Sequence, residues 1–156
     1  MKYSDYLCDD KFVIFLLHGV VKKTDYRIRN YNFKHIYYDQ FYKILKDKKK
    51  EYEFYSMNDL ISFNLNKRKK PKNFFYIVTF DDGFKNNILA CEILEFLKIP
   101  SIFYLTSGLI NTKKIFWVDE IEDRIASANK KKFHIIINEN KRFLFPICSK
   151  QNKVKA

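Results

Sequence analysis

Two adjacent carboxylates are the side chains of this chain best suited to chemistry. Asp81 and Asp82 follow an apolar run, Phe74-Phe75-Tyr76-Ile77-Val78, and stand just before Gly83. A buried strand is therefore expected to deliver both acids into a turn, where the glycine lets the backbone change direction. Neighbouring carboxylates repel each other unless they share a cation or a proton, so the pair indicates a site. The alternative is ordinary turn chemistry, in which Asp82 caps the following helix.

The longer string around the acids carries a family resemblance. Thr79-Phe80-Asp81-Asp82-Gly83-Phe84, a helix after it and the strand Ser101–Leu105 resemble the polysaccharide deacetylase family, the NodB-like carbohydrate esterases. Phe12–Val20 is similar to the family's first strand, which often ends in a turn that contains histidine, and Ile99–Gly108 is similar to its third-strand segment. Ile115–Asp119 is similar to a segment of members that act on surface polysaccharides, and the likeness extends from about Phe12 to Arg124.

This resemblance implies a fold, a reaction and a set of site residues. The fold would be an α/β partial (β/α) barrel of the polysaccharide deacetylase type. The activity would be metal-dependent removal of N-acetyl groups from a polysaccharide or surface glycan. Asp82 would be a ligand of a divalent metal, usually zinc in this family, and Asp81 would be the general base. His18, at the expected carboxyl end of a strand, is a further candidate ligand. Trp117 is a candidate for stacking on a sugar ring, and its alternative is a core position.

One departure from the family pattern bears on activity. Family members carry a second motif, His-(Ser/Thr)-x-x-His, whose two imidazoles lie one helical turn apart. The chain has three histidines, His18, His35 and His134, and no two of them stand four residues apart. We therefore expect the front portion of a deacetylase, with an incomplete ligand set, weak zinc binding and no activity by itself. His134 fits a plain strand residue, and His35 carries no functional signal. The alternatives are a non-catalytic remnant and a small basic binding protein with a coincidental acidic string.

Length, composition and charge bound the remaining possibilities. The 156 residues suit one domain, 1–156, with a frayed tail at 149–156, but a complete (β/α) barrel typically needs ~200 residues or more. A hydrophobic content of 47% argues for a packed core. The net charge of +12 fits a polyanion partner, and the basic run 67–72 is the densest patch. No aromatic interleaving or nucleic-acid motif accompanies that run. We therefore expect a solvated loop there and favour no nucleic-acid partner. The family resemblance implies a glycan as substrate, and the oligomeric state is left open.

Cysteine usage and the N-terminal sequence predict a cytoplasmic location. The three cysteines, Cys8, Cys91 and Cys148, are odd in number and show no Cys-x-x-Cys spacing, which fits free thiols in a reducing compartment. Residues 1–5 lack the layout of a signal peptide, and the apolar run 12–17 is far too short to cross a bilayer.

The pattern of apolar residues predicts the elements that position the acids. Strand-like runs alternate with amphipathic helices, which favours a mainly parallel sheet with flanking helices. The segment 74–106 has the order strand, helix, strand, a βαβ unit. The expected sheet strands are 12–17, 74–80 and 101–106, with a short strand at 53–55. The expected helices are 39–46, 56–63 with Ser56 or Asn58 as cap, 84–98 and 119–128, followed by a hairpin of 133–138 and 141–145.

Overall fold

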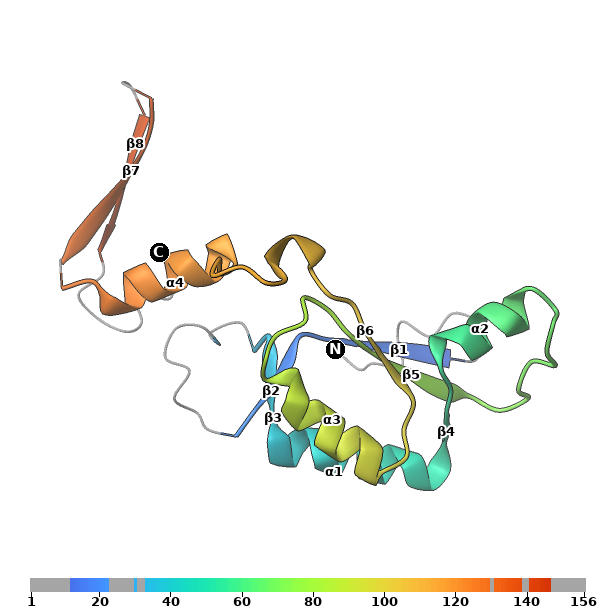
Figure 1. Cartoon of the computed structure of the whole chain (residues 1–156). Coiled ribbons are helices and arrows are strands. Elements are labelled where there is room, and N and C mark those ends of the chain that lie inside the picture. The colour runs from blue at the N-terminus through green and yellow to red at the C-terminus, as the bar shows by residue number, and fades with distance from the viewer. Residues whose placement is uncertain (1–11, 23–29, 31–32, 130, 139–140, 147–156) are drawn as a thin grey trace. The chain divides into compact units, whose positions relative to one another are not determined.

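A computed structural model describes residues 12–22, 30, 33–129, 131–138 and 141–146 (Figure 1). These residues fall into two compact units. The first is built from residues 1–23 and 34–107, and the second from residues 24–33 and 108–156. The predicted tail at 149–156 and the turn at 139–140 lie outside the described residues. None of the helices among the described residues is long and apolar enough to cross a membrane.

The first unit is organised around the strand that precedes the acids. This strand, β5 (Phe75–Phe80), pairs in parallel with β1 (Phe12–Leu17) along its whole length. Its other edge is shared by β4 (Glu53–Phe54) at the amino end and β6 (Ser101–Phe103) at the carboxyl end, both also parallel. The predicted α/β arrangement with a mainly parallel sheet is confirmed. No closed barrel forms among the described residues.

Two helices, α1 (Tyr38–Glu51) and α3 (Asn87–Phe96), and a pair of short parallel strands also belong to this unit. The pair consists of β2 (Gly19–Val21) and β3 (His35–Tyr37), which the sequence did not predict. The helix α1 runs five residues past its predicted end. Its last turn contains Lys48, Lys49 and Lys50, and positive charge is favourable at a helix C-terminus. The helix α3 is shorter than predicted, because residues 84–86 form turns before it.

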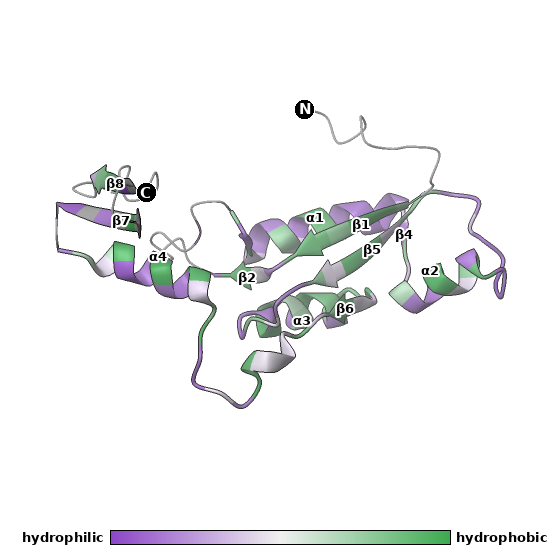
Figure 2. Cartoon of the chain, turned by 90° about the horizontal axis from the view of Figure 1, so that it is seen from above, coloured by the Kyte–Doolittle hydropathy of each residue, from purple (hydrophilic) through white to green (hydrophobic). Residues whose placement is uncertain are grey.

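The central strand is buried on both faces, which explains its unbroken apolar sequence. Val78 and Phe80 belong to a core cluster with Phe41 of α1 and Ile93 of α3. Phe75 and Ile77 belong to a second cluster, with Leu60 and Phe63 of α2 (Met57–Asn64). The apolar colouring of β1 and β5 in Figure 2 follows the same pattern.

A 3₁₀ turn (Ser107–Leu109) spans the boundary between the units, and the second unit contains the helix α4 (Trp117–Ser127) and a hairpin. The strands of the hairpin are β7 (Lys132–Asn138) and β8 (Lys141–Pro146), which pair antiparallel as predicted. On α4, Arg124 donates to the carboxylate of Glu120 at 2.6 Å, a pair one helical turn apart. The alternative of Trp117 as a core residue is wrong, because 72% of its surface is exposed.

Candidate active site at the carboxyl end of the parallel sheet

Residues that follow β1 and β5 stand side by side at the carboxyl edge of the sheet. The register pairs Leu17 with Phe80, the last residues of the two strands. The backbone N–H of Asp81 then donates to the carbonyl oxygen of Leu17 at 2.8 Å, so the ladder continues one step beyond the strands. His18 and Asp81 are therefore neighbours in the backbone, as expected for two parallel strands that end together.

Strand alternation places His18 and Asp81 on one face of the sheet. Ile14 pairs with Ile77 and Leu16 with Thr79, and successive residues of a strand point to opposite faces. Continuing the period of two brings His18 onto the face of Leu16, and Asp81 onto the face of Thr79. The Thr79 hydroxyl donates to the carbonyl oxygen of Phe15 at 3.0 Å, which satisfies the polar group next to the site.

The third strand brings a residue that the sequence interpretation did not single out. The backbone N–H of Tyr104 donates to the carbonyl oxygen of Phe80 at 2.8 Å, so Tyr104 follows β6 just as Asp81 follows β5. Its side chain is 45% exposed. No sequence signal marked Tyr104, because the expected strand 101–106 contains it. The strand β6 ends at Phe103 instead, which leaves Tyr104 at the carboxyl end, where sites form in α/β folds.

The turn that carries the acids has an unusual backbone. Asp82 has a φ of +72° and Gly83 a φ of +70°, so two consecutive residues occupy the left-handed region. Only glycine adopts this region freely, although aspartate tolerates it better than most residues. A Cβ atom added at Gly83 would lie 2.6 Å from Cδ2 of Leu105, so the Leu105 side chain would have to move, whereas the positive φ is the stronger reason for glycine. Backbone held in this region is a feature that clusters at functional sites.

The structure also excludes the capping interpretation of Asp82. The helix α3 begins at Asn87, and its N-cap is Asn86. Asp82 is therefore separated from the N-cap by Gly83, Phe84 and Lys85. No side chain caps this helix, so the acids do not stabilise its first turn.

Both carboxylates are half-buried and lack a neutralising partner in the part of the chain that the structure describes. The side chains of Asp81 and Asp82 make no hydrogen bond or ion pair with another described residue. Two adjacent acids with no internal cation are suited to binding an external one. The described residues do not complete a metal site by themselves, however. They contain no group of three or more His, Cys, Asp or Glu side chains that could hold a metal ion.

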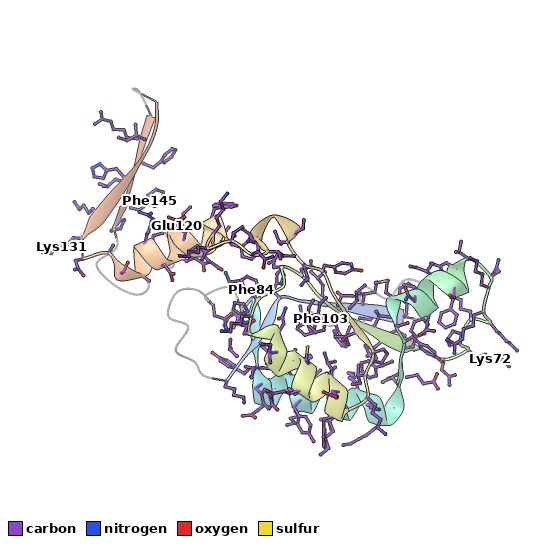
Figure 3. All side chains as sticks on the ribbon, viewed as in Figure 1. Lys72, Phe84, Phe103, Glu120, Lys131 and Phe145 are labelled. Carbon is purple, nitrogen blue, oxygen red and sulfur yellow. The ribbon has the colours of Figure 1, made fainter. Side chains whose placement is uncertain are left out.

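The other histidines have different surroundings. His134 lies on β7 in the second unit and is exposed. His35 begins β3 and is only 3% exposed, with its ring edge against the ring of Phe84 at a centroid distance of 5.1 Å. Phe84 lies in the same turn as the acids, just before α3 (Figure 3). No sequence pattern predicts this contact, because residues 35 and 84 meet only through the tertiary fold.

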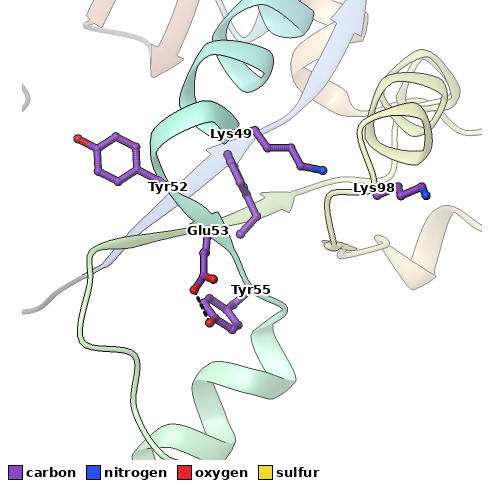
Figure 4. A pocket seen from close by; sticks show the side chains of 6 residues that line it. Lys49, Tyr52, Glu53, Tyr55 and Lys98 are labelled. Carbon is purple, nitrogen blue, oxygen red and sulfur yellow. Dashed lines mark hydrogen bonds between the residues drawn. The ribbon is translucent and has the colours of Figure 1, made fainter.

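A separate cavity of about 320 Å³ lies near the amino end of the sheet (Figure 4). Its lining residues are Lys49, Tyr52, Glu53, Phe54, Tyr55 and Lys98. Tyr55 donates from its hydroxyl to Oε2 of Glu53 at 2.6 Å, and this hydrogen bond raises the pKa of Tyr55. Glu53 pairs with Phe75, the first residue of β5, whereas the acids follow the last, so the two places lie ~20 Å apart along the strand.

Comparison with solved structures identifies the fold. The chain is similar to IcaB from Ammonifex degensii, with a TM-score of 0.56 and 20% identity over 75% of this chain and 49% of that one. It is also similar to BC0361, a polysaccharide deacetylase from Bacillus cereus, with a TM-score of 0.51 and 21% identity over 74% and 36%. A de-N-acetylase from Aggregatibacter actinomycetemcomitans matches with a TM-score of 0.50 and 18% identity over 88% and 46%.

These similarities show that the chain has the polysaccharide deacetylase fold, as the sequence resemblance implied. The chain spans half or less of the length of each of these structures. No protein-family model matches the chain. No curated protein matches it either.

Proposed function

We propose that this chain supplies the Asp-Asp half of the active site of a metal-dependent hydrolase that removes N-acetyl groups from a polysaccharide or surface glycan. The observation that carries the proposal is the position of Asp81 and Asp82, which follow the central strand of a polysaccharide deacetylase fold and have no counter-charge among the described residues. The exposed hydrophobic residues Ile14 (41%) and Leu16 (60%) lie on the sheet face assigned to His18 and Asp81. Exposed apolar side chains of this kind are suited to being covered by additional polypeptide.

Each acid has a distinct role in this proposal. Asp82 donates a carboxylate to a divalent metal, with zinc as the expected ion, and Asp81 is the general base. Asp81 accepts a proton from the water that attacks the carbonyl carbon of the N-acetyl group. The tetrahedral intermediate then collapses as the C–N bond breaks, the proton held by Asp81 passes to the leaving amine nitrogen, and acetate is released. A bound metal would supply the positive charge that keeps both acids ionised and polarises the carbonyl.

The metal ligand set is incomplete in these residues, so the proposal has a second part. Catalytic zinc sites use three protein ligands. The His-(Ser/Thr)-x-x-His pattern of the family does not occur in the sequence. We propose that the missing ligands come from polypeptide beyond these 156 residues, with His18 as a further candidate. Trp117, exposed at the start of α4, is the proposed contact for a sugar ring. A cytoplasmic location stays part of the proposal, supported by the free thiol of Cys91.

The isolated chain and a completed enzyme test these two parts separately. Calorimetric titration of the 156-residue chain with zinc should show at most weak binding that salt reduces. A preparation that also contains a polypeptide with the His-(Ser/Thr)-x-x-His motif should bind zinc stoichiometrically and release acetate from an N-acetylated glycan. Tight zinc binding by the isolated chain, abolished in Asp82→Ala, would show that a residue such as His18 completes the site.

A second candidate function is a non-catalytic remnant of a deacetylase. The same exposed positions on β1 favour it, because an uncovered apolar sheet face promotes aggregation. It predicts no acetate release under any condition, including the completed preparation.

A further inference from the structure

His35 is buried between the two loops that carry the candidate site residues. It is the first residue of β3, and the register places it directly beside Gly19 of β2. Gly19 follows His18, the candidate ligand after β1. His35 itself is 3% exposed, so its ring is held by its neighbours rather than by water.

Two contacts connect the His35 ring to the loop after β5. The ring lies at 85° to the ring of Phe84, with centroids 5.1 Å apart, the edge-to-face arrangement that aromatic rings prefer. Nδ1 of His35 lies 3.4 Å from Nδ2 of Asn86. Phe84 and Asn86 both belong to the segment between Asp82 and the start of α3, so His35 contacts that loop at two points.

The backbone of Gly19 lies close to the side chains of both His35 and Asn86. A Cβ atom added at Gly19 would lie 2.5 Å from Nδ1 of His35 and 2.4 Å from Oδ1 of Asn86. No side chain fits at this position unless both neighbours move. The backbone after His18 therefore contacts His35 and the loop of the acids at the same place.

Some buried polar atoms beside His35 have no hydrogen-bond partner among the described residues, which lowers the stability of the fold. They are Oδ1 of Asn86 and both amide atoms of Asn87. Each such atom costs stability, and an apolar side chain would avoid the cost. Turning the Asn86 amide would place its oxygen toward Nδ1 of His35, which would then donate to it as Nδ1–H. Either amide orientation gives the ring a specific partner, which an apolar residue cannot do.

We propose that His35 is a positioning residue that fixes the loop of Asp81 and Asp82 relative to the backbone of His18. It acts through Phe84 and Asn86 on the one side and through Gly19 on the other. Its effect on a reaction rests on the proposed function, whereas its effect on the loop is a property of this chain alone.

Hydrogen exchange of individual amides in the full chain tests this proposal. In His35→Ala, the amides of Asn87, Ile88 and Leu89, which donate to the carbonyl oxygens of Phe84, Lys85 and Asn86, should exchange about tenfold faster, because a hydrogen bond and an aromatic contact are lost. The amides of Ile77 and Val78 within β5 should keep their rates. His35→Asn keeps a polar atom near the position of Nδ1, so it should restore most of the protection. Leu60→Ala is the matched control, since it removes a buried side chain from the cluster around α2 instead.

The outcomes separate positioning from general stability. Equal acceleration of these amides in His35→Ala and Leu60→Ala, or no acceleration in His35→Ala, would overturn the proposal. If His35→Ala does not fold, Phe84→Leu and Asn86→Ala remove the two contacts from the loop side and should each accelerate the same amides. Unchanged protection in both would also overturn it.

Zinc titration and acetate release distinguish the two proposals. Both would be measured on the same variants, each combined with a polypeptide that carries the His-(Ser/Thr)-x-x-His motif (the completed preparation). If the wild-type preparation neither binds zinc nor releases acetate, the proposed function fails while the exchange result still stands. If it does both, His35→Ala should weaken zinc binding several-fold and His35→Asn should recover it.

Discussion

The backbone N–H of Asp81 donates to the carbonyl oxygen of Leu17 at 2.8 Å, one step beyond the ends of β5 and β1. This bond holds the first acid beside His18, 63 positions away in the sequence. Two parallel strands that end together thus bring three candidate residues, His18, Asp81 and Asp82, to one edge of the sheet.

Substituting Gly83 should destabilise the fold for two separable reasons. Gly83→Ala places a Cβ in the left-handed region, which costs ~1–2 kcal/mol, and directs it at the side chain of Leu105. Leu105→Ala in the same chain should remove the steric part and leave the backbone part. Gly108→Ala is the matched control, because a Cβ there meets nothing within 4 Å. Urea denaturation would measure the free energy of unfolding of Gly83→Ala, of Gly83→Ala combined with Leu105→Ala, and of Gly108→Ala. If Gly108→Ala lowered the free energy of unfolding as much as Gly83→Ala, the explanation would be contradicted.

Ser56 should contribute measurably to stability through the start of α2. Its hydroxyl accepts from the backbone N–H of Asp59 at 3.1 Å, and the Asp59 carboxylate accepts from the backbone N–H of Ser56 at 3.0 Å, which is a capping box. Ser56→Ala should lower the free energy of unfolding by ~1 kcal/mol. Ser62→Ala, on the same helix but away from its cap, serves as the control and should cost clearly less. Thermal denaturation followed by circular dichroism would measure both.

Acid should weaken the fold through Asp59. Hydrogen bonds from Ser56 to its carboxylate, with Arg68 nearby, hold the pKa of Asp59 below its usual value of 3.8. The folded state thus prefers the ionised form, so this stabilisation is complete above the unfolded pKa and is lost as pH falls through the folded one. Asp59→Asn should be less stable than the wild type at neutral pH, and the difference should shrink below about pH 4. A difference that stays constant between pH 7 and pH 2.5 would show that the charge of Asp59 has no such role.

The sequence predicted the parts of the fold in which local pattern and tertiary packing agree. The apolar run at 74–78 followed by an amphipathic helix sufficed for the β5–α3–β6 unit. The sequence left Ser56 and Asn58 as alternative caps of α2, and the structure selects Ser56, whose hydroxyl accepts from the backbone N–H of Asp59. The pairing of β2 with β3 was missed, since three-residue strands show too little periodicity to recognise. The helix α1 was predicted to end at residue 46, where a run rich in lysine begins. Lysine is a good helix former, so the helix continues through this run to Glu51.

The site was predictable only in part. Asp81 and Asp82 were recognisable because two adjacent acids after a buried strand are rare and costly. Their neighbours were not, because the contacts of His35 with Phe84 and Asn86 join segments about fifty residues apart. Tyr104 was overlooked because nothing in its immediate sequence marks it, and only the register of β6 brings it to the edge of the acids.

The most direct test of the proposed function compares the two acids in a preparation completed by the His-(Ser/Thr)-x-x-His polypeptide. Acetate release from one N-acetylated glycan and bound zinc would be measured for the wild type, Asp81→Asn and Asp82→Asn. Asp82→Asn should lose both zinc and activity, because a neutral amide is a poorer ligand. Asp81→Asn should keep zinc and lose about 10²–10⁴-fold in turnover, the usual contribution of a positioned base. Equal zinc loss in both variants would contradict the assigned roles, and full acetate release by both would contradict the account as a whole.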